Sequence, residues 1–257
     1  MKKAIFTLLI STFLGSCDSP KITKTEAVST TNYPTEINAI FEKHGGIKTW
    51  SKMKTLYFEI EKPDGNEKQT IDLQTRYDLI ETPKATIGFD GTDSWVLEKG
   101  EPYKGKARFY HNLMFYFYAM PFVLGDKGIK YEKTTDLTFE GKTYSGYKIS
   151  YEAKVGDSPD DNYFLYFNKE TDAMEWLGYT VTFGSNKPSE KVSFIRYNDW
   201  KTVNGLVLPN TLSWYKVENG VPTTVRNKMT FVNIKATEIP TPKTLFAKPE
   251  QAKYVSK

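Results

Sequence analysis

The sequence predicts a mainly β protein of the α+β class, built as one antiparallel meander with an N-terminal helix and a second helix in mid-chain. Phe, Trp and Tyr make up 15% of the 257 residues, and these residues are common in strands because flat rings pack well on a pleated surface. From Met53 onward, alternating apolar and polar residues are separated by turn signals such as Asp90-Gly91 and Asn204-Gly205. Short loops of this kind join antiparallel neighbours. No internal repeat or composition shift divides this part, so we expect one domain over residues 34–257.

The N-terminus predicts a secreted, lipid-anchored protein. Lys2 and Lys3 precede the apolar stretch Ala4–Leu14, which is too short to span a bilayer. The following LGSC resembles the lipobox of bacterial lipoproteins, which are cleaved before an acylated cysteine, and Cys17 is the only cysteine of the chain. We expect residues 1–16 to be a lipoprotein signal peptide and Cys17 to anchor the protein to an envelope membrane, facing the periplasm. Inner and outer membrane both remain open, as does an ordinary secretory signal with an incidental cysteine.

A tether and a short helix are expected next. Residues 17–33 contain the lipidated cysteine and are rich in Ser, Thr and Lys, which predicts a flexible segment. Ile37, Ile40 and Phe41 then recur at helical spacing, and Gly45-Gly46 end the helix. His44 lies on the apolar side near the end of this helix, where we favour a hydrogen-bonded structural histidine over a catalytic one.

The strands are predicted from the alternation of apolar and polar residues. Leu56, Phe58 and Ile60 share one face of the first strand, and residues 71–80 (IDLQTRYDLI) predict another continuous strand with Ile71, Leu73, Tyr77 and Leu79 on one face. The stretch NYFLYFN is apolar on both faces, which predicts a strand covered on both sides. Further strands are expected over residues 147–151, 163–168, 175–183, 192–198, 210–217 and 225–235.

Residues 106–122 interrupt the strand pattern and predict a helix. On a helical wheel, Arg108, His111 and Asn112 form a narrow polar seam, and apolar side chains sweep about 200° of the remainder, although one buried face needs only about 100°. A transmembrane span is disfavoured because the polar residues and Pro121 interrupt the stretch. An interfacial membrane helix is disfavoured because its polar face is nearly uncharged. We therefore expect this helix to lie in the concave side of a curved sheet.

The broad apolar arc predicts either plain core filling or the lining of a ligand cavity, and both remain open. The cavity candidates from the helix and from the strands are Tyr110, Leu113, Met114, Tyr116, Phe117, Met120, Trp95, Trp176 and Trp214. Phe115 is the one large aromatic residue on the polar seam. We expect it to be exposed there as a partner contact, unless a loop covers it.

Four segments resemble the LolA/LolB-like superfamily of envelope lipoprotein carriers: FEKHGGIKTWSKMKTL, IGFDGTDSWV, NLMFYFYAMPFVLGDKGIKYE and YNDWKTVNGLVLPNTL. The resemblance implies a single unclosed, strongly curved antiparallel β half-barrel, with the N-terminal and mid-chain helices covering its concave face. It also implies a hydrophobic cavity between sheet and helices for an acyl chain, a lipid or a lipoprotein.

Several other functions lack a sequence signal. The formal charge of +4 falls to +2 without Lys2 and Lys3, and acidic and basic residues interleave, which argues against nucleic acid. Two histidines exclude a His-rich metal site, the acidic turn GDSPDDN lacks calcium-loop spacing, and no phosphate-binding or dinucleotide motif is present. We expect no metal, no cofactor and no enzymatic activity. A scaffold lipoprotein with a filled core and an envelope hydrolase acting on glycans or esters are the alternatives, and the oligomeric state is open.

Overall fold

The computed structural model describes residues 33–151, 161–182, 189 and 191–255. Cys17, the signal peptide, residues 17–32 of the tether and most of the acidic turn lie outside this part. The chain from Tyr33 onward forms one compact unit that holds every described element together with its core. A unit with its own core folds on its own, so residues 33–257 are suitable for experiments in solution.

A 13-stranded antiparallel sheet dominates this unit, and a separate two-stranded hairpin lies beside it. The order in the large sheet is β15-β5-β4-β3-β2-β1-β14-β13-β10-β9-β8-β7-β6, so the sheet has two free edges and does not close into a barrel. The predicted unclosed antiparallel sheet is confirmed. Its strands, together with the hairpin β11–β12, are β1 (Thr55–Ile60), β2 (Glu67–Asp72), β3 (Asp78–Glu81), β4 (Ala85–Phe89), β5 (Ser94–Glu98), β6 (Ile129–Phe139), β7 (Lys142–Tyr151), β8 (Tyr163–Phe167), β9 (Met174–Tyr179), β10 (Ser193–Arg196), β11 (Trp200–Val203), β12 (Leu206–Pro209), β13 (Thr211–Glu218), β14 (Val221–Thr237) and β15 (Lys253–Tyr254).

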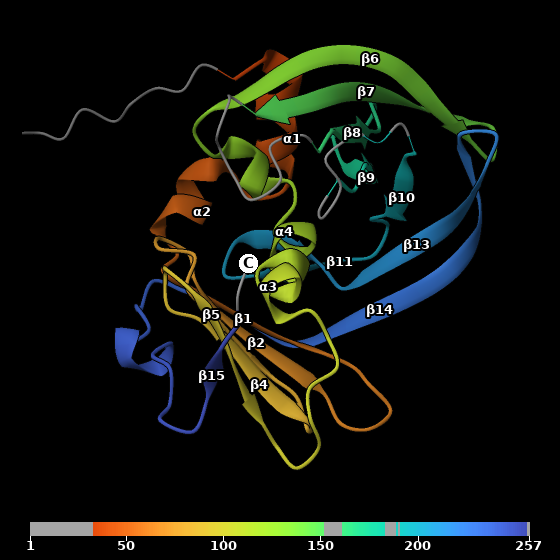
Figure 1. Cartoon of the computed structure of the whole chain (residues 1–257). Helices are drawn as coiled ribbons and strands as arrows, with labels where there is room; N and C mark the ends of the chain where they lie inside the picture. Colours follow the sequence, from red (N-terminus) through yellow and green to blue (C-terminus); the bar gives the residue numbers. More distant parts are fainter. Residues whose placement is uncertain (1–32, 152–160, 183–188, 190, 256–257) are drawn as a thin grey trace, which may run out of the picture. The chain divides into compact units, whose positions relative to one another are not determined.

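The long strand β14 joins the two halves of the sheet. Its first part, up to Thr230, pairs with β13, and its second part, from Phe231, pairs with β1. Both pairings contain a register irregularity, and such bulges increase twist and bend a sheet. Figure 1 shows the sheet curving from β5 and β4 through β14 to β6 and β7 around the helices.

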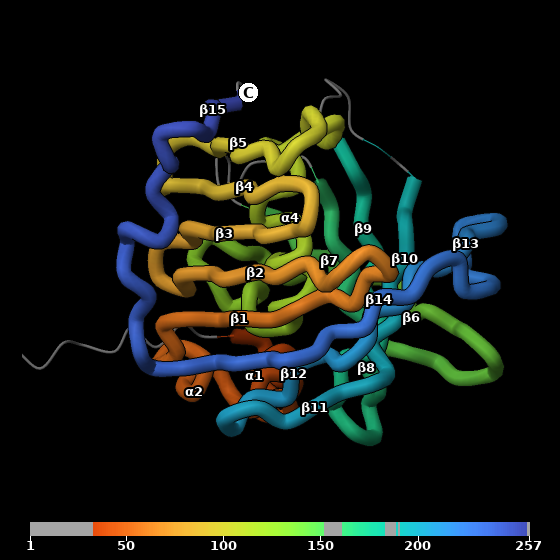
Figure 2. Tube along the Cα trace, turned by 90° about the horizontal axis from the view of Figure 1, so that it is seen from below, coloured from red at the N-terminus to blue at the C-terminus, as the bar shows by residue number. Residues whose placement is uncertain are grey.

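The helices lie inside this curve. They are α1 (Thr35–Lys43), α2 (Ile47–Lys52), α3 (Ala107–Tyr110), α4 (Leu113–Tyr118) and the 3₁₀ turn η1 (Phe122–Gly125), and a second 3₁₀ turn, η2 (Lys243–Leu245), precedes β15. In Figure 2, α4 lies behind the successive strands β5 to β1. The main core forms between helices and sheet: Tyr118 of α4 packs against Phe58 of β1 and Phe231 of β14, with ring centroids 4.4 and 4.5 Å apart.

A second core covers the opposite face of the sheet. It consists of Leu137, Phe139, Tyr144, Tyr166, Trp176 and Phe194, which we call the outer core. Along β8, Leu165 and Phe167 point into the main core, whereas Tyr166 belongs to the outer core, as expected because successive side chains of a strand face opposite sides. The prediction that NYFLYFN is covered on both faces is confirmed.

The predicted single strand over residues 71–80 is wrong, because the chain turns there and forms the β2–β3 hairpin. The Asp72 Oδ1 atom accepts hydrogen bonds from the N–H groups of Gln74 and Thr75, both at 2.9 Å, and Arg76 adopts a left-handed conformation with φ of 62°. A side chain that binds the backbone two and three residues ahead stabilises a turn. The alternation of apolar residues across the turn reflects two antiparallel strands rather than one.

The predicted helix over residues 106–122 is also interrupted. His111 is extended and Asn112 is left-handed, with φ of 57°, so that α3 and α4 are separate helices. The Asn112 N–H donates to Oδ2 of the buried Asp78 at 2.7 Å, and Asn is among the residues that best tolerate this conformation. The helical wheel therefore does not apply across the break. Phe115, expected to be exposed, is fully buried, and the Arg76 guanidinium lies 4.8 Å from its ring centroid.

His44 is a buried structural histidine that ties α1 to two strands. Its Nδ1 lies 3.3 Å from the Val207 carbonyl oxygen, which can accept its proton, and Nε2 accepts a hydrogen bond from the Met174 N–H at 3.2 Å. The Val207 N–H in turn donates to the His44 carbonyl at 2.8 Å. This arrangement requires a neutral ring, and burial lowers the pKa of His44 to about 4.

We expect His44 to make stability depend on pH. Since its pKa is about 4 when folded and 6.5 in the unfolded chain, its contribution is present above pH 6.5 and is lost as the pH falls toward 4. The loss between pH 7 and 5 is about 2 kcal/mol. Burial raises the pKa of Asp78 to about 6. Asp78 therefore contributes stability at low pH that is lost as the pH rises, which is the opposite of the dependence expected for His44. Urea unfolding of wild type and His44→Gln isolates the histidine, because Asp78 is common to both, and equal pH slopes would contradict the assignment.

Candidate functional site

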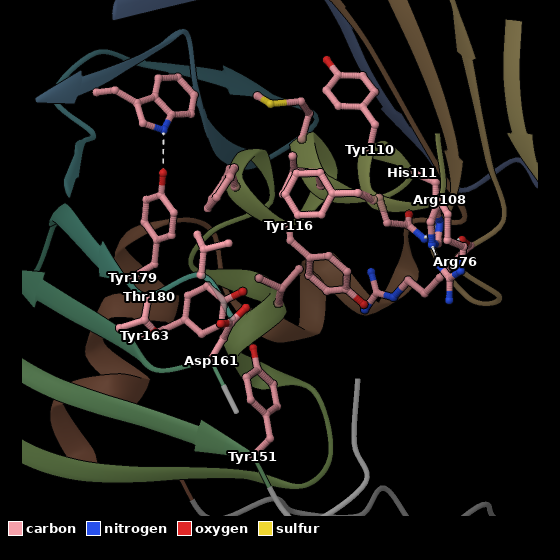
Figure 3. Close-up of a pocket in the computed structure, with 18 of the residues that line it drawn as sticks. Arg76, Arg108, Tyr110, His111, Tyr116, Tyr151, Asp161, Tyr163, Tyr179 and Thr180 are labelled. Atoms are coloured by element: carbon pink, nitrogen blue, oxygen red, sulfur yellow. Dashed lines mark hydrogen bonds between the residues drawn. The ribbon is translucent and has the colours of Figure 1, made fainter. Parts of the chain in front are cut away.

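A cavity of about 800 Å³ lies between the α3–α4 region and the sheet. Its wall is formed by α3, α4 and the segment between them, by the β2–β3 turn, by β4, β7, β8, β9, β13 and β14, and by the residues that follow η1. Figure 3 shows its lining side chains, with Tyr179 and Thr180 on one side and Arg76, Arg108 and His111 on the other. The break in the predicted helix creates part of this wall, because His111 and Asn112 both line the cavity.

Most of the wall is apolar. Phe117 packs against the rings of Tyr179 and Trp214, with centroids 4.9 and 6.0 Å apart. The Trp214 Nε1–H donates to the Tyr179 hydroxyl at 3.1 Å, so the polar ends of these two rings satisfy each other. Leu113 and Met229 extend the apolar surface from α4 to β14. Surface of this kind suits hydrocarbon chains, because apolar contacts do not demand a particular orientation.

Phenol groups line one region of the cavity. Tyr116 is 36% exposed, and Tyr151 and Tyr163 line the cavity near Asp161. Burial raises the pKa of Tyr151 and of Tyr163 far above the usual value for tyrosine, so both remain protonated. Asp161 Oδ1 accepts hydrogen bonds from the N–H and the hydroxyl of Thr182, at 2.7 and 2.8 Å.

Two arginines lie at the other side. Arg76 Nη2 donates to both carboxylate oxygens of Asp126, at 2.9 and 2.8 Å, and burial raises the pKa of Asp126. The Arg108 guanidinium forms a hydrogen bond with Nε2 of His111 and lies 5.8 Å from the ring centroid of Phe89. A guanidinium only donates hydrogen bonds, so Nε2 is the acceptor.

Three buried polar residues, Asp78, His111 and Asn112, lie next to these arginines. The Asp78 carboxylate lies 4.0 Å from His111 Nδ1 and accepts the Asn112 N–H. The Asn112 side-chain amide donates to the Arg76 carbonyl at 3.0 Å and lies 3.2 Å from His111 Nδ1. The main-chain and side-chain N–H groups of Asn112 thus join the Asp78 carboxylate to the Arg76 carbonyl next to His111.

The structure brings together six of the nine predicted cavity residues. Tyr110, Leu113, Met114, Tyr116, Phe117 and Trp214 line the cavity. The other three are placed differently: Met120 lies in the main core and Trp176 in the outer core. Trp95 is buried near η2, where its Nε1–H donates to the Phe246 carbonyl at 3.0 Å. Strand alternation alone could not assign these tryptophans to the cavity face, since β5 and β9 carry buried apolar residues on both faces.

Apart from Tyr110 and Tyr116, the sequence did not indicate the polar part of the cavity. Arg76 lies in a turn that was expected to be a strand, and Tyr151, Tyr163 and Tyr179 belong to strands whose proximity depends on the sheet order. Within the described part of the chain, no three His, Cys, Asp or Glu side chains are grouped so that they could hold a metal ion. In the same part, no helix is both long and apolar enough for a membrane crossing.

The sequence matches the family of unknown function DUF6503 over residues 103–228. This region runs from the segment before α3 to the first half of β14, and therefore includes most of the cavity wall. No curated protein matches the chain.

Solved structures with similar folds come from several bacteria. The LolA superfamily protein NE2245 from Nitrosomonas europaea is 10% identical, with 82% of this chain and 96% of that chain covered and a TM-score of 0.44. A DUF1329 family protein from Desulfovibrio piger is 11% identical, with 82% and 97% covered and a TM-score of 0.48. The lipoprotein LppX from Mycobacterium tuberculosis is 8% identical, with 74% and 100% covered and a TM-score of 0.27.

Proposed function

We propose that this protein is a lipid-anchored protein of the bacterial cell envelope that binds a hydrophobic ligand in the cavity between α3–α4 and the sheet. The ligand is an acyl chain, a lipid or the lipid part of a lipoprotein. One observation carries the proposal: a cavity of about 800 Å³ with an apolar wall formed by residues such as Leu113, Phe117 and Trp214. Its volume lies within the range of small-molecule sites, which is about 300–1,000 Å³.

The distribution of polar groups also favours an amphipathic ligand over a purely structural role for the aromatic helix. A filled core contains few polar side chains, whereas the described residues that line this cavity include an apolar wall, a set of phenol groups and three arginines. Ligand sites combine a mostly apolar lining with a few placed polar groups in the same way. A scaffold lipoprotein would not need such an arrangement.

The anchor belongs to the proposal because a tethered domain can take up or release a lipid close to the membrane surface. Cys17 lies outside the described residues, and its acylation stays a prediction from the LGSC motif. We expect cells supplied with labelled palmitate to label the wild-type chain and not Cys17→Ser. Equal labelling of the two chains would remove the anchor from the proposal.

The ligand hypothesis is tested with residues 33–257, purified and then extracted with organic solvent. We expect mass spectrometry of the extract to show a lipid, and an uncharged fluorescent acyl ester to bind the extracted protein. Leu113→Trp should weaken ester binding about tenfold, because the larger ring occupies the cavity. Val221→Trp is the matched control, because Val221 is 45% exposed on β14 and does not line the cavity. No extracted lipid and no ester binding would favour the scaffold alternative.

The hydrolase alternative receives no support from the histidine it would require. His44 is bonded to the main chain of Val207 and Met174, and His111 accepts a hydrogen bond from Arg108. Of the two carboxylates among the described residues that line the cavity, Asp126 is paired with Arg76 and Asp161 accepts two hydrogen bonds from Thr182. Hydrolysis of an acyl ester by the purified protein would revive this alternative.

A further inference from the structure

The break between α3 and α4 involves only two residues. His111 has φ of −58° and ψ of 139°, and Asn112 has φ of 57° and ψ of −9°, whereas the chain is helical on both sides. Both residues line the cavity, as do Arg108 on α3 and Leu113 on α4. A change of backbone conformation at these two positions would therefore reorient one helix relative to the other and reshape the wall that they form.

A continuous helix is the local alternative to the break. In such a helix the N–H of Asn112 would donate to the carbonyl of Arg108, four residues earlier. The preceding residue still follows this rule, since the His111 N–H donates to the Ala107 carbonyl at 2.9 Å. The apolar side chains of residues 106–122 also recur at helical spacing. The local pattern of this segment is therefore compatible with one uninterrupted helix.

The Asp78 carboxylate takes the place of the Arg108 carbonyl. Its Oδ2 atom accepts the Asn112 N–H at 2.7 Å, and the residue is only 1% exposed. The Asn112 side-chain amide donates to the Arg76 carbonyl at 3.0 Å, so that two hydrogen bonds join Asn112 to the hairpin of β2 and β3. A hydrogen bond to an ionised group is about twice as strong as a neutral one. An ionised Asp78 thus favours the broken form over the continuous helix.

The surroundings of Asp78 make this hydrogen bond sensitive to protonation. Burial raises the pKa of Asp78 to about 6, although the charges of His111 and Arg108 act in the opposite direction. The His111 Nδ1 atom lies 4.0 Å from the carboxylate. The residues that pair with Asp78 in the sheet, Ile71 of β2 and Phe89 of β4, are uncharged. The charged or titratable side chains that act on Asp78 therefore come from the α3 side.

We propose that residues 107–118 form a two-state element of the ligand cavity, in which Asp78 holds the segment broken at Asn112 and only the broken form binds ligand. Asp78 is then a positioning residue, because it acts through Asn112 and does not line the cavity. The inference rests on the proposed function, since it concerns the regulation of the same cavity. It goes further in requiring that the affinity for ligand depends on how strongly the break is held.

The first test compares two substitutions of Asn112 in residues 33–257, with the methyl ester of dansyl-undecanoic acid as an uncharged probe. Asn112→Gly and Asn112→Ala remove the same side-chain hydrogen bond and keep the N–H that Asp78 binds. Glycine adopts a left-handed conformation readily, whereas alanine does not. We expect the alanine variant to bind the ester about fivefold more weakly than the glycine variant, with circular dichroism showing that both are folded.

Asn219 supplies the matched control pair. It is also left-handed, with φ of 51°, but it lies in the exposed β13–β14 turn and does not line the cavity. Asn219→Gly and Asn219→Ala should therefore differ in stability and bind the ester equally. A segment with only one conformation would behave in the same way at Asn112, so equal affinities of the two Asn112 variants overturn the inference.

The second test is the pH profile of ester binding. Between pH 7 and pH 5, Asp78 changes from mostly ionised to mostly protonated, because its pKa is about 6. We expect the affinity of the wild-type protein to fall about threefold over this interval, since a neutral carboxyl group holds the N–H less strongly. Asp78→Asn is uncharged at both pH values and should lack this fall. The probe and all other titratable groups are common to both proteins, so parallel profiles contradict the assignment.

The outcomes separate this inference from the proposed function. Absence of ester binding to the wild-type protein overturns the proposed function itself. Ester binding that is equal in the two Asn112 variants overturns the two-state element and leaves the hydrophobic cavity intact. Should Asp78→Asn fail to fold, the Asn112 pair decides the question, because both of its members keep Asp78.

Discussion

Phe117→Asp is expected to unfold the domain or to lower its melting temperature by more than about 10 °C. The Phe117 side chain is only 6% exposed and packs between Tyr179 and Trp214, and the Tyr197 hydroxyl donates to its carbonyl at 2.7 Å. Removing a buried phenylalanine costs about 3–5 kcal/mol, and a carboxylate in its place adds a desolvation penalty. At about 2–4 °C per kcal/mol for a domain of this size, the loss is readily measured by calorimetry or circular dichroism.

The neighbouring position supplies the control. Tyr116 is on the same helix but 36% exposed, so Tyr116→Asp should change the free energy of unfolding by about 1 kcal/mol or less. The pair therefore tests the orientation of α4 as well as the burial of one ring. An unchanged melting temperature for Phe117→Asp would show that this side chain does not face the interior.

Gly45→Ala is expected to destabilise the domain by about 3 kcal/mol. Gly45 has φ of +106°, and a Cβ atom there would lie 2.1 Å from the Gly205 carbonyl oxygen. The backbone conformation costs an alanine about 1–2 kcal/mol, and the overlap with main-chain atoms costs about as much again. The contact is between the end of α1 and the β11–β12 turn, next to the His44–Val207 hydrogen bonds, so neither side can move without breaking them.

A second glycine separates the two contributions. Gly141, in the β6–β7 turn, also has a positive φ of +76°, but a Cβ atom there would meet nothing within 4 Å. Gly141→Ala should therefore lower the free energy of unfolding only by the cost of holding an alanine at positive φ, about 1–2 kcal/mol. Urea unfolding of the two variants measures the difference, and equal losses would mean that α1 does not approach the hairpin as closely as described.

The sequence predicted the elements whose signals are local. Ile37, Ile40 and Phe41 repeat at helical spacing and are all buried in α1, and Leu56, Phe58 and Ile60 alternate and are all buried in β1. In contrast, β6 was not predicted, because this edge strand is largely exposed and shows no regular apolar face. An edge strand lacks a covering layer, so burial leaves no periodic pattern in its residues.

The mid-chain segment shows where local reasoning fails. Residues 106–122 have helical periodicity, but the stretch breaks at Asn112, whose N–H binds a carboxylate 34 positions earlier in the chain. That long-range hydrogen bond stabilises a left-handed residue that no helical pattern anticipates. The break also changes the direction of every later side chain, and Phe115 is consequently buried under Arg76 instead of facing solvent.

Local patterns in the sequence are sufficient to predict the fold class and the order of the elements: a candidate lipoprotein signal with a single cysteine, one helix, and an antiparallel meander interrupted by an aromatic segment. These features depend on residues close together in the chain, so their physical causes can be read there. Which aromatic side chains line the cavity and which fill a core depends instead on the packing of the helices against the curved sheet. It also placed Arg76 beside Arg108, because the sheet and the α3–α4 break bring together residues that local patterns cannot connect.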